Sequence, residues 1–210
     1  LIPSNDFSYY DQILDLSLTV GAIPARYNSL LNKVDRKYNL DLYFAMARGF
    51  QQEGVDVTAM EMTKWFDTNY HYIVPEFVKD QTFKLTSEKF LNEYNEAKAI
   101  GIETKPVLIG PISYLLLGKE KEEGFNRIDL IDKLVTVYEE ILSKLAEAGA
   151  QYIQIDEPFL ALDIDAATRA LYAPVFQKLA AAAQNSKLIV ATYFEALRDN
   201  EETAVNLPVH

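Results

Sequence analysis

Apolar runs of strand length recur along the chain, and each is followed by a stretch with helical periodicity. Five runs predict β-strands: LIPSND at 1–6, EMTKWF at 61–66, KPVLIGP at 105–111, QYIQIDEP at 151–158 and KLIVATYFE at 187–195. Amphipathic patterns between them predict helices over 9–20, 87–100, 129–148 and 165–183, and glycines at 21, 101 and 149 end the first three. The alternation predicts parallel strands joined by right-handed crossovers.

Polar residues occupy alternate positions near the carboxyl ends of several predicted strands. Ile153 and Ile155 have one parity, whereas Gln154 and Asp156 have the other. Such alternation is typical of a βα barrel, in which one parity packs on helices and the other lines the interior. We therefore predict an α/β fold with a parallel TIM-like barrel that is incomplete, holding about five of the eight strands. The start LIPSND also favours a piece of a barrel. Residues 1–210 are expected to form one domain without an internal linker.

Composition narrows the class of protein. A chain of 210 residues with 49% hydrophobic residues can bury a sizeable core. Its 31 Asp and Glu outnumber 20 Lys and Arg, and the net charge of −11 opposes non-specific attraction to nucleic acid or anionic membranes. Without cysteine the segment has no disulfide or thiolate metal site. No membrane span or secretory signal is visible, so the sequence predicts a soluble, cytoplasmic protein without nucleic-acid or membrane partners.

Lys64 stands among apolar and aromatic neighbours in EMTKWFDTNYHYIVPEF, residues 61–77. A buried ammonium without a partner is very costly, so a strand ending at the rim of a pocket suits this pattern. There a lysine could capture a phosphate or carboxylate. The alternative is a salt bridge to a carboxylate at a neighbouring strand end, such as Asp6 or Asp156, and the residues alone leave both open.

Other polar and aromatic residues follow on the same loop. His71 could be a general base, a ligand or a structural histidine, but the only other histidine is His210 and a zinc site needs about three or four ligands. Tyr70 and Tyr72 could form a flat wall against a ring-shaped ligand, although ordinary loop packing is the more frequent use of such residues.

The IDEP element at 155–158 places two carboxylates at a strand end. Paired carboxylates there could be the acid and nucleophile of a glycoside hydrolase. Asp156 and Glu157 have opposite parity, however, so a regular strand would not turn both toward one substrate atom. The sequence also has no G-x-S-x-G elbow, P-loop or G-x-G-x-x-G fingerprint.

Several long motifs carry a resemblance to a known family. LIPSNDFSYYD, GAIPARY, EMTKWFDTNYHYIVPEF, KPVLIGPISYLLLGK, QYIQIDEPFLALD and ATYFE occur in this order. Together they resemble the N-terminal domain of the cobalamin-independent methionine synthases, and the similarity spans nearly the whole chain.

The resemblance implies a zinc-dependent methyltransferase built from two face-to-face βα barrels. In this family, zinc held by His, Cys and Glu ligands of the C-terminal barrel binds homocysteine, whose thiolate takes the methyl group of 5-methyltetrahydropteroyltriglutamate without cobalamin. The implied partners are these two substrates and the C-terminal barrel of the same chain. The segment would supply no zinc ligand and no catalytic residue. It would be the central part of the N-terminal barrel, lacking the first strand and the last two, and inactive alone.

By motif match, Lys64 corresponds to a folate-binding lysine that meets the anionic glutamate tail. Asn69 and His71 are weaker candidates on the same loop, and the resemblance assigns Asp156 and Glu157 to support of the barrel mouth. The alternative to this interpretation is a self-contained barrel hydrolase, or a module that binds anionic ligands, using Asp156, Glu157 and Lys64.

Overall fold

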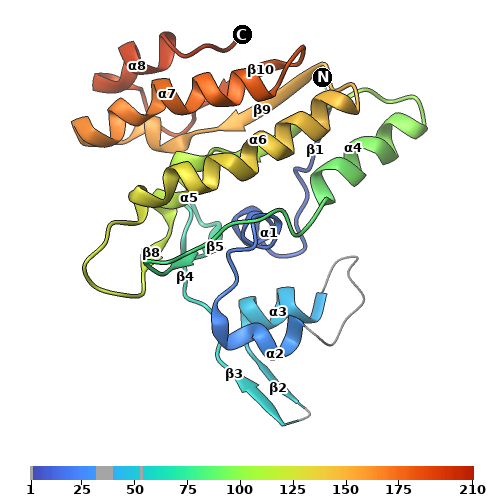
Figure 1. The fold of residues 1–210 in the computed structure, drawn as a ribbon, viewed down its shortest axis with the longest axis vertical. Helices are drawn as coiled ribbons and strands as arrows, with labels where there is room; N and C mark the ends of the chain where they lie inside the picture. The colour runs from blue at the N-terminus through green and yellow to red at the C-terminus, as the bar shows by residue number, and fades with distance from the viewer. Residues whose placement is uncertain (1, 32–39, 53) are drawn as a thin grey trace.

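Four of the predicted strands form one parallel sheet in the computed structural model, which describes residues 2–31, 40–52 and 54–210 (Figure 1). The sheet order is β1 (Ile2–Ser4), β7 (Thr104–Ile109), β9 (Tyr152–Asp156) and β10 (Lys187–Ala191). Ile2 pairs with Thr104, Val107 with Gln154, and Lys187 with Tyr152. The chain is thus α/β with a mostly parallel central sheet. Among the described residues β1 and β10 are its two edges, so the sheet is open.

The strand predicted at 61–66 does not join this sheet, and the expected five parallel strands are four. Its residues form β4 (Met62–Lys64), which pairs antiparallel with β5 (His71–Ile73) in a separate hairpin. The chain reverses because the Thr68 amide donates to the Trp65 carbonyl at 3.2 Å and the Trp65 amide to the Tyr70 carbonyl at 2.7 Å. Polar turn formers over 67–69 are the sequence signal for this reversal.

The four predicted helices are confirmed with slightly shorter bounds. They are α1 (Gln12–Thr19), α4 (Lys89–Ala99), α6 (Ile131–Glu147) and α7 (Ala166–Ala182). In α6 the side chains at 134, 138, 141 and 145 are all fully buried, as the spacing of one helix face requires. The predicted end of α6 is also confirmed, because Gly149 takes a φ of 90°, a conformation that costs glycine little. Helices α6 and α7 pack together over β9 and β10 (Figure 1).

The shorter elements were not predicted from the sequence. They are α2 (Asn28–Leu31), α3 (Leu40–Arg48), β2 (Phe50–Gln52), β3 (Val55–Val57), β6 (Glu76–Phe77), α5 (Pro111–Leu117), β8 (Lys119–Glu120) and α8 (Glu201–Val205). Most contain fewer than two helical turns or only two to three strand residues, too few for a periodic pattern to show. No helix of the described part of the chain is both long and apolar enough to cross a membrane.

Helix α1 lies between two hydrophobic clusters. Its residues Ile13 and Leu16 belong to the larger cluster, which includes the sheet, α6 and α7. Leu14 and Leu18 belong to the smaller cluster, with buried residues of α2 and α3. Strand β5 is divided in the same way, because Tyr72 and Ile73 point to opposite faces. The β4–β5 hairpin is therefore held at the boundary between the two clusters.

We expect Gly118→Ala to destabilise the folded protein strongly, because Gly118 packs closely against Phe77 and Pro75. A Cβ at 118 would lie 2.2 Å from a ring carbon of Phe77 and 2.9 Å from the Pro75 carbonyl oxygen. The free energy of unfolding, measured by urea denaturation, should fall by about 2 kcal/mol or more. Gly124→Ala is the matched control, since a Cβ there meets nothing within 4 Å and only its φ of 81° is unfavourable. That variant should lose about 1 kcal/mol. Equal losses would contradict the packing described around Gly118.

Candidate functional site

The candidate site lies where the carboxyl ends of the parallel strands meet. Because β1, β7, β9 and β10 run in one direction, the residues that follow them collect at one edge of the sheet. Asn5 follows β1 with a φ of 58°, and Phe194 follows β10 with a φ of 83°. Non-glycine residues rarely adopt positive φ, and such strain concentrates at functional sites. The edge is therefore the part of the fold to search for ligand-binding groups.

Aromatic contacts hold the tip of the β4–β5 hairpin against this edge. The ring of Phe66, two residues after the end of β4, lies 5.6 Å from Phe159 and 5.1 Å from Phe194. Phe159 follows β9 and Phe194 follows β10. Phe66 itself has a φ of 53°, so the backbone is strained at the contact. The hairpin thus reaches the strand ends without joining the sheet.

Lys64 lies on this hairpin with its side chain exposed. It pairs in register with His71, which is also exposed. Among the described residues no carboxylate lies within ion-pair distance of Lys64, so the predicted alternative of a salt bridge to Asp6 or Asp156 does not form. An exposed ammonium near the strand ends is free to meet an anion.

Of the two weaker candidates, His71 lies opposite Lys64 and Asn69 lies in the turn that joins β4 to β5. Asn69 and His71 are exposed, and the Nδ1 atom of His71 lies 3.0 Å from the Asn69 carbonyl oxygen. Tyr70 is 42% exposed, whereas Tyr72 is buried and donates its hydroxyl hydrogen to the Leu117 carbonyl at 3.0 Å. Tyr72 is therefore a packing residue, and the idea that both tyrosines form a wall for a ligand is wrong for Tyr72.

Asp156 ends β9 in a small polar network. Its carboxylate accepts a hydrogen bond from the Gln154 side-chain amide at 2.6 Å, and the Lys105 ammonium donates to the other end of that amide. Burial raises the pKa of Asp156 above its ordinary value, while the contacts with Gln154 and Tyr193 oppose the rise. Its neighbours Gln154 and Tyr193 therefore satisfy this carboxylate.

Glu157 points the other way and is inaccessible. Its carboxylate accepts hydrogen bonds from the backbone amides of Ile112 and Ser113, at 3.2 and 2.9 Å, and from the Ser113 hydroxyl at 2.6 Å. The side chain is 0% exposed, and burial raises its pKa to about 7. Asp156 and Glu157 thus face different surroundings, as their parity predicts. No substrate can reach Glu157, which argues against the paired-carboxylate hydrolase.

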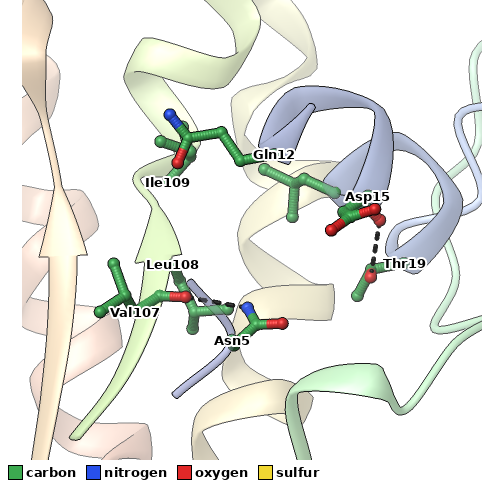
Figure 2. Close-up of a pocket in the computed structure, with 8 residues that line it drawn as sticks. Asn5, Gln12, Asp15, Thr19, Val107, Leu108 and Ile109 are labelled. Atoms are coloured by element: carbon green, nitrogen blue, oxygen red, sulfur yellow. Dashed lines mark hydrogen bonds between the residues drawn. The ribbon is translucent and has the colours of Figure 1, made fainter. Parts of the chain in front are cut away.

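The cavity in Figure 2 lies below the strand ends, between β7 and α1. Its volume is about 20 Å³, room for about one water molecule. Asn5 lines it and donates from its side-chain amide to the Val107 carbonyl at 2.8 Å, while Lys89 donates to the Asn5 side-chain oxygen at 3.1 Å. Lys89 also pairs with Glu93 at 2.8 Å. These hydrogen bonds explain how Asn5 keeps its strained conformation. The cavity itself is too small to hold a substrate.

A larger hollow of about 450 Å³ lies beyond the C-terminal end of α1. It is lined by the loop after α1 and by residues of β6 and its continuation. Arg26 there forms two hydrogen bonds to Glu76, at 2.6 and 2.8 Å, so its charge is neutralised. The Arg26–Glu76 pair therefore contributes no net charge to the hollow.

A metal centre does not fit the described residues. None of their His, Asp and Glu side chains gather in a group of three or more that could hold an ion, and the chain has no cysteine. The donor set that zinc prefers is therefore not provided by this part of the chain.

A family model and several related proteins all identify the same family for this chain. Residues 1–210 match the family model described as the N-terminal domain of the cobalamin-independent synthase. Over 209 residues the chain is 63% identical to the 5-methyltetrahydropteroyltriglutamate–homocysteine methyltransferase of Flavobacterium johnsoniae. It is 58% identical over 210 residues to the enzyme of that name from Cytophaga hutchinsonii, and 53% identical over 214 residues to the one from Salinibacter ruber. All of this chain is covered, but it spans only 27% of the length of each relative.

The raised pKa of Glu157 predicts a pH dependence of stability. Between its ordinary value of 4.5 and about 7, the folded protein keeps a proton on Glu157 that the unfolded chain has released. The free energy of unfolding should therefore fall as the pH rises through this window. Urea denaturation at about pH 5 and about pH 7.5 should show a smaller difference in Glu157→Gln than in the wild type, because glutamine does not titrate. Equal differences in the two proteins would mean that Glu157 titrates normally.

Proposed function

We propose that this chain, which belongs to the cobalamin-independent synthase family and matches the N-terminal domain of those proteins, is the folate-binding part of a methyltransferase. The reaction would move the methyl group of 5-methyltetrahydropteroyltriglutamate to homocysteine, giving methionine. The names of the relatives at 63% and 58% identity support this activity. The chain spans 27% of their length, so the proposal assigns it substrate binding and assigns the chemical step to the rest of the protein.

The single observation that carries this role is the exposed Lys64 on the hairpin over the strand ends. Each glutamyl residue of a folate tail adds a carboxylate, so the tail is a polyanion. The chain has a net charge of −11 and would repel a polyanion in general. A lysine without an ion-pair partner among the described residues can still attract the tail locally. His71 lies opposite it in the hairpin and Asn69 is exposed in the adjoining turn, and both are polar groups that the tail could contact.

We also propose that residues 1–210 are the central part of one βα barrel. The sheet order β1-β7-β9-β10 follows the chain without the reversal that marks a doubly wound sheet. In this proposal the open edges at β1 and β10 continue into strands outside the described residues, and a C-terminal barrel of the same chain completes the active site. Zinc, for which the described residues offer no group of ligands, would lie in that other part, and cobalamin is not used. A cytoplasmic location stays a prediction from the sequence.

Lys64→Ala in the full-length enzyme should raise the KM for the triglutamyl folate roughly 10- to 100-fold, the loss of one or two charged hydrogen bonds. The KM for homocysteine should stay the same, because homocysteine does not carry the tail. The effect should be much smaller with the monoglutamyl folate, which presents fewer carboxylates. Steady-state kinetics with both folates measures these quantities.

Two further variants serve as controls for Lys64→Ala. Lys178→Ala makes the same change in charge on α7, where Lys178 pairs with Asp132 at 2.7 Å, and should leave both KM values unchanged. Lys64→Arg keeps the charge and should retain part of the affinity. An unchanged KM for the triglutamyl folate in Lys64→Ala would refute the proposed role.

A further inference from the structure

We infer that Asp11 is a positioning residue that holds the Lys64 hairpin in place through a single shared carboxylate. The inference rests on the proposed role of Lys64 in binding the folate tail. One carboxylate oxygen of Asp11 accepts hydrogen bonds from the backbone amides of Ile13 and Leu14, at 2.8 and 2.9 Å, and so caps α1. The other oxygen accepts from the backbone amide of Ile73 in β5, at 3.0 Å. The same side chain therefore joins the start of α1 to the hairpin.

The hydrogen-bond pattern of the hairpin explains why Ile73 needs this partner. The Val74 amide donates to the Glu61 carbonyl at 2.8 Å, and the Trp65 amide donates to the Tyr70 carbonyl at 2.7 Å. Since paired residues alternate in an antiparallel ladder, the Ile73 amide points outward from β4. Ile73 is 1% exposed, so water cannot satisfy that amide. Asp11 supplies the acceptor.

The register carries this anchor to Lys64. Ile73 is opposite Met62, and His71 is opposite Lys64, two residues nearer the turn of the hairpin on each strand. Because side chains two residues apart point to the same face, Lys64 and His71 extend the same face that is buried at Ile73. Fixing the Ile73 amide against α1 therefore fixes the distance and direction of Lys64 from the strand ends.

Helix α1 is a firm reference for such an anchor. It packs on both hydrophobic clusters, and Asp11 at its start is 0% exposed. Burying a carboxylate is unfavourable, and burial raises the pKa of Asp11 to about 7. Capping alone does not need this cost, because an exposed aspartate caps α7: Asp165 accepts from the Thr168 amide at 2.7 Å. The additional bond to Ile73 is what distinguishes Asp11 from that ordinary cap.

Asp11→Ser in the full-length enzyme separates the two roles. Serine still caps a helix, but its side chain is one atom shorter than that of aspartate and has a single oxygen. It therefore cannot also bind the Ile73 amide. We expect the KM for the triglutamyl folate to rise at least about 5-fold, since displaced binding groups lose much of their effect. The KM for homocysteine should stay within about twofold of the wild type. In the Lys64→Ala background, Asp11→Ser should add no further increase, because the group it positions is gone.

Asp11→Asn is a second variant of nearly equal size, which also caps helices well. Its amide group has one acceptor oxygen, so it can serve α1 or Ile73 but not both, and the same kinetic pattern is expected. Glu157→Gln is the matched control, since Glu157 is equally buried and accepts two backbone amides at the start of α5 rather than from the hairpin. It should lower the thermal unfolding temperature without changing the ratio of the two KM values.

The outcomes separate this inference from the proposed function. If Lys64→Ala leaves the KM for the triglutamyl folate unchanged, the proposed function itself is wrong. If Lys64→Ala raises that KM but Asp11→Ser does not, only the inference is overturned. A fully additive effect of the two substitutions, or a parallel rise in the homocysteine KM, would also overturn it, because either result indicates general damage instead of positioning.

Discussion

The start of a buried helix leaves backbone amides without partners, and in this protein two buried carboxylates supply the missing acceptors. Asp11 binds the first amides of α1, and Glu157 binds the first amides of α5. Both carboxylates are 0% exposed. Each also reaches a second element, since Asp11 binds β5 and Glu157 contacts Tyr172 of α7 at 3.3 Å. The requirement to satisfy these amides therefore fixes how helices, sheet and hairpin lie relative to one another.

Close packing around Glu157 reinforces this arrangement. A Cβ at position 110 would lie 2.1 Å from a carboxylate oxygen of Glu157, so only glycine lets the carboxylate approach the start of α5. Gly110 also lies between the end of β7 at Ile109 and the start of α5 at Pro111, and its amide donates to the Asp156 carbonyl at 2.8 Å. The strand ends of β7 and β9 are thereby joined to each other and to a helix. A rigid edge of this kind is a suitable base for a binding site.

The β4–β5 hairpin adds an exposed cation, Lys64, to that edge of the sheet. The two acidic groups at the end of β9 are occupied by neighbours, Asp156 by Gln154 and Glu157 by the start of α5. Lys64 is brought to the edge from outside the sheet, and aromatic contacts of Phe66 hold the turn there. The division between a supporting sheet and an added cationic hairpin explains why a chain of net charge −11 can still offer an anion a favourable contact.

The elements with a strong hydrophobic period, and Lys64 with its unusual surroundings, could be predicted from the sequence. Four strands and four helices follow from their patterns, the glycine at 149 marks a helix end, and Lys64 stands out because a cation is unexpected among aromatic residues. The opposite orientation of Asp156 and Glu157 also follows from strand parity. The motifs further indicated the family, which the comparisons confirm.

The pairing of the strand at 61–66, and the backbone amides that the buried carboxylates bind, depend on tertiary contacts and could not be predicted from the sequence. The pattern of EMTKWF is the same in a parallel sheet and in a hairpin, because the alternation of side chains does not depend on the partner strand. Asp11 gave no signal either, since its contact with Ile73 joins residues 62 positions apart. Local patterns report the faces of single elements, whereas the acceptor that a buried amide finds depends on which elements the whole fold brings together.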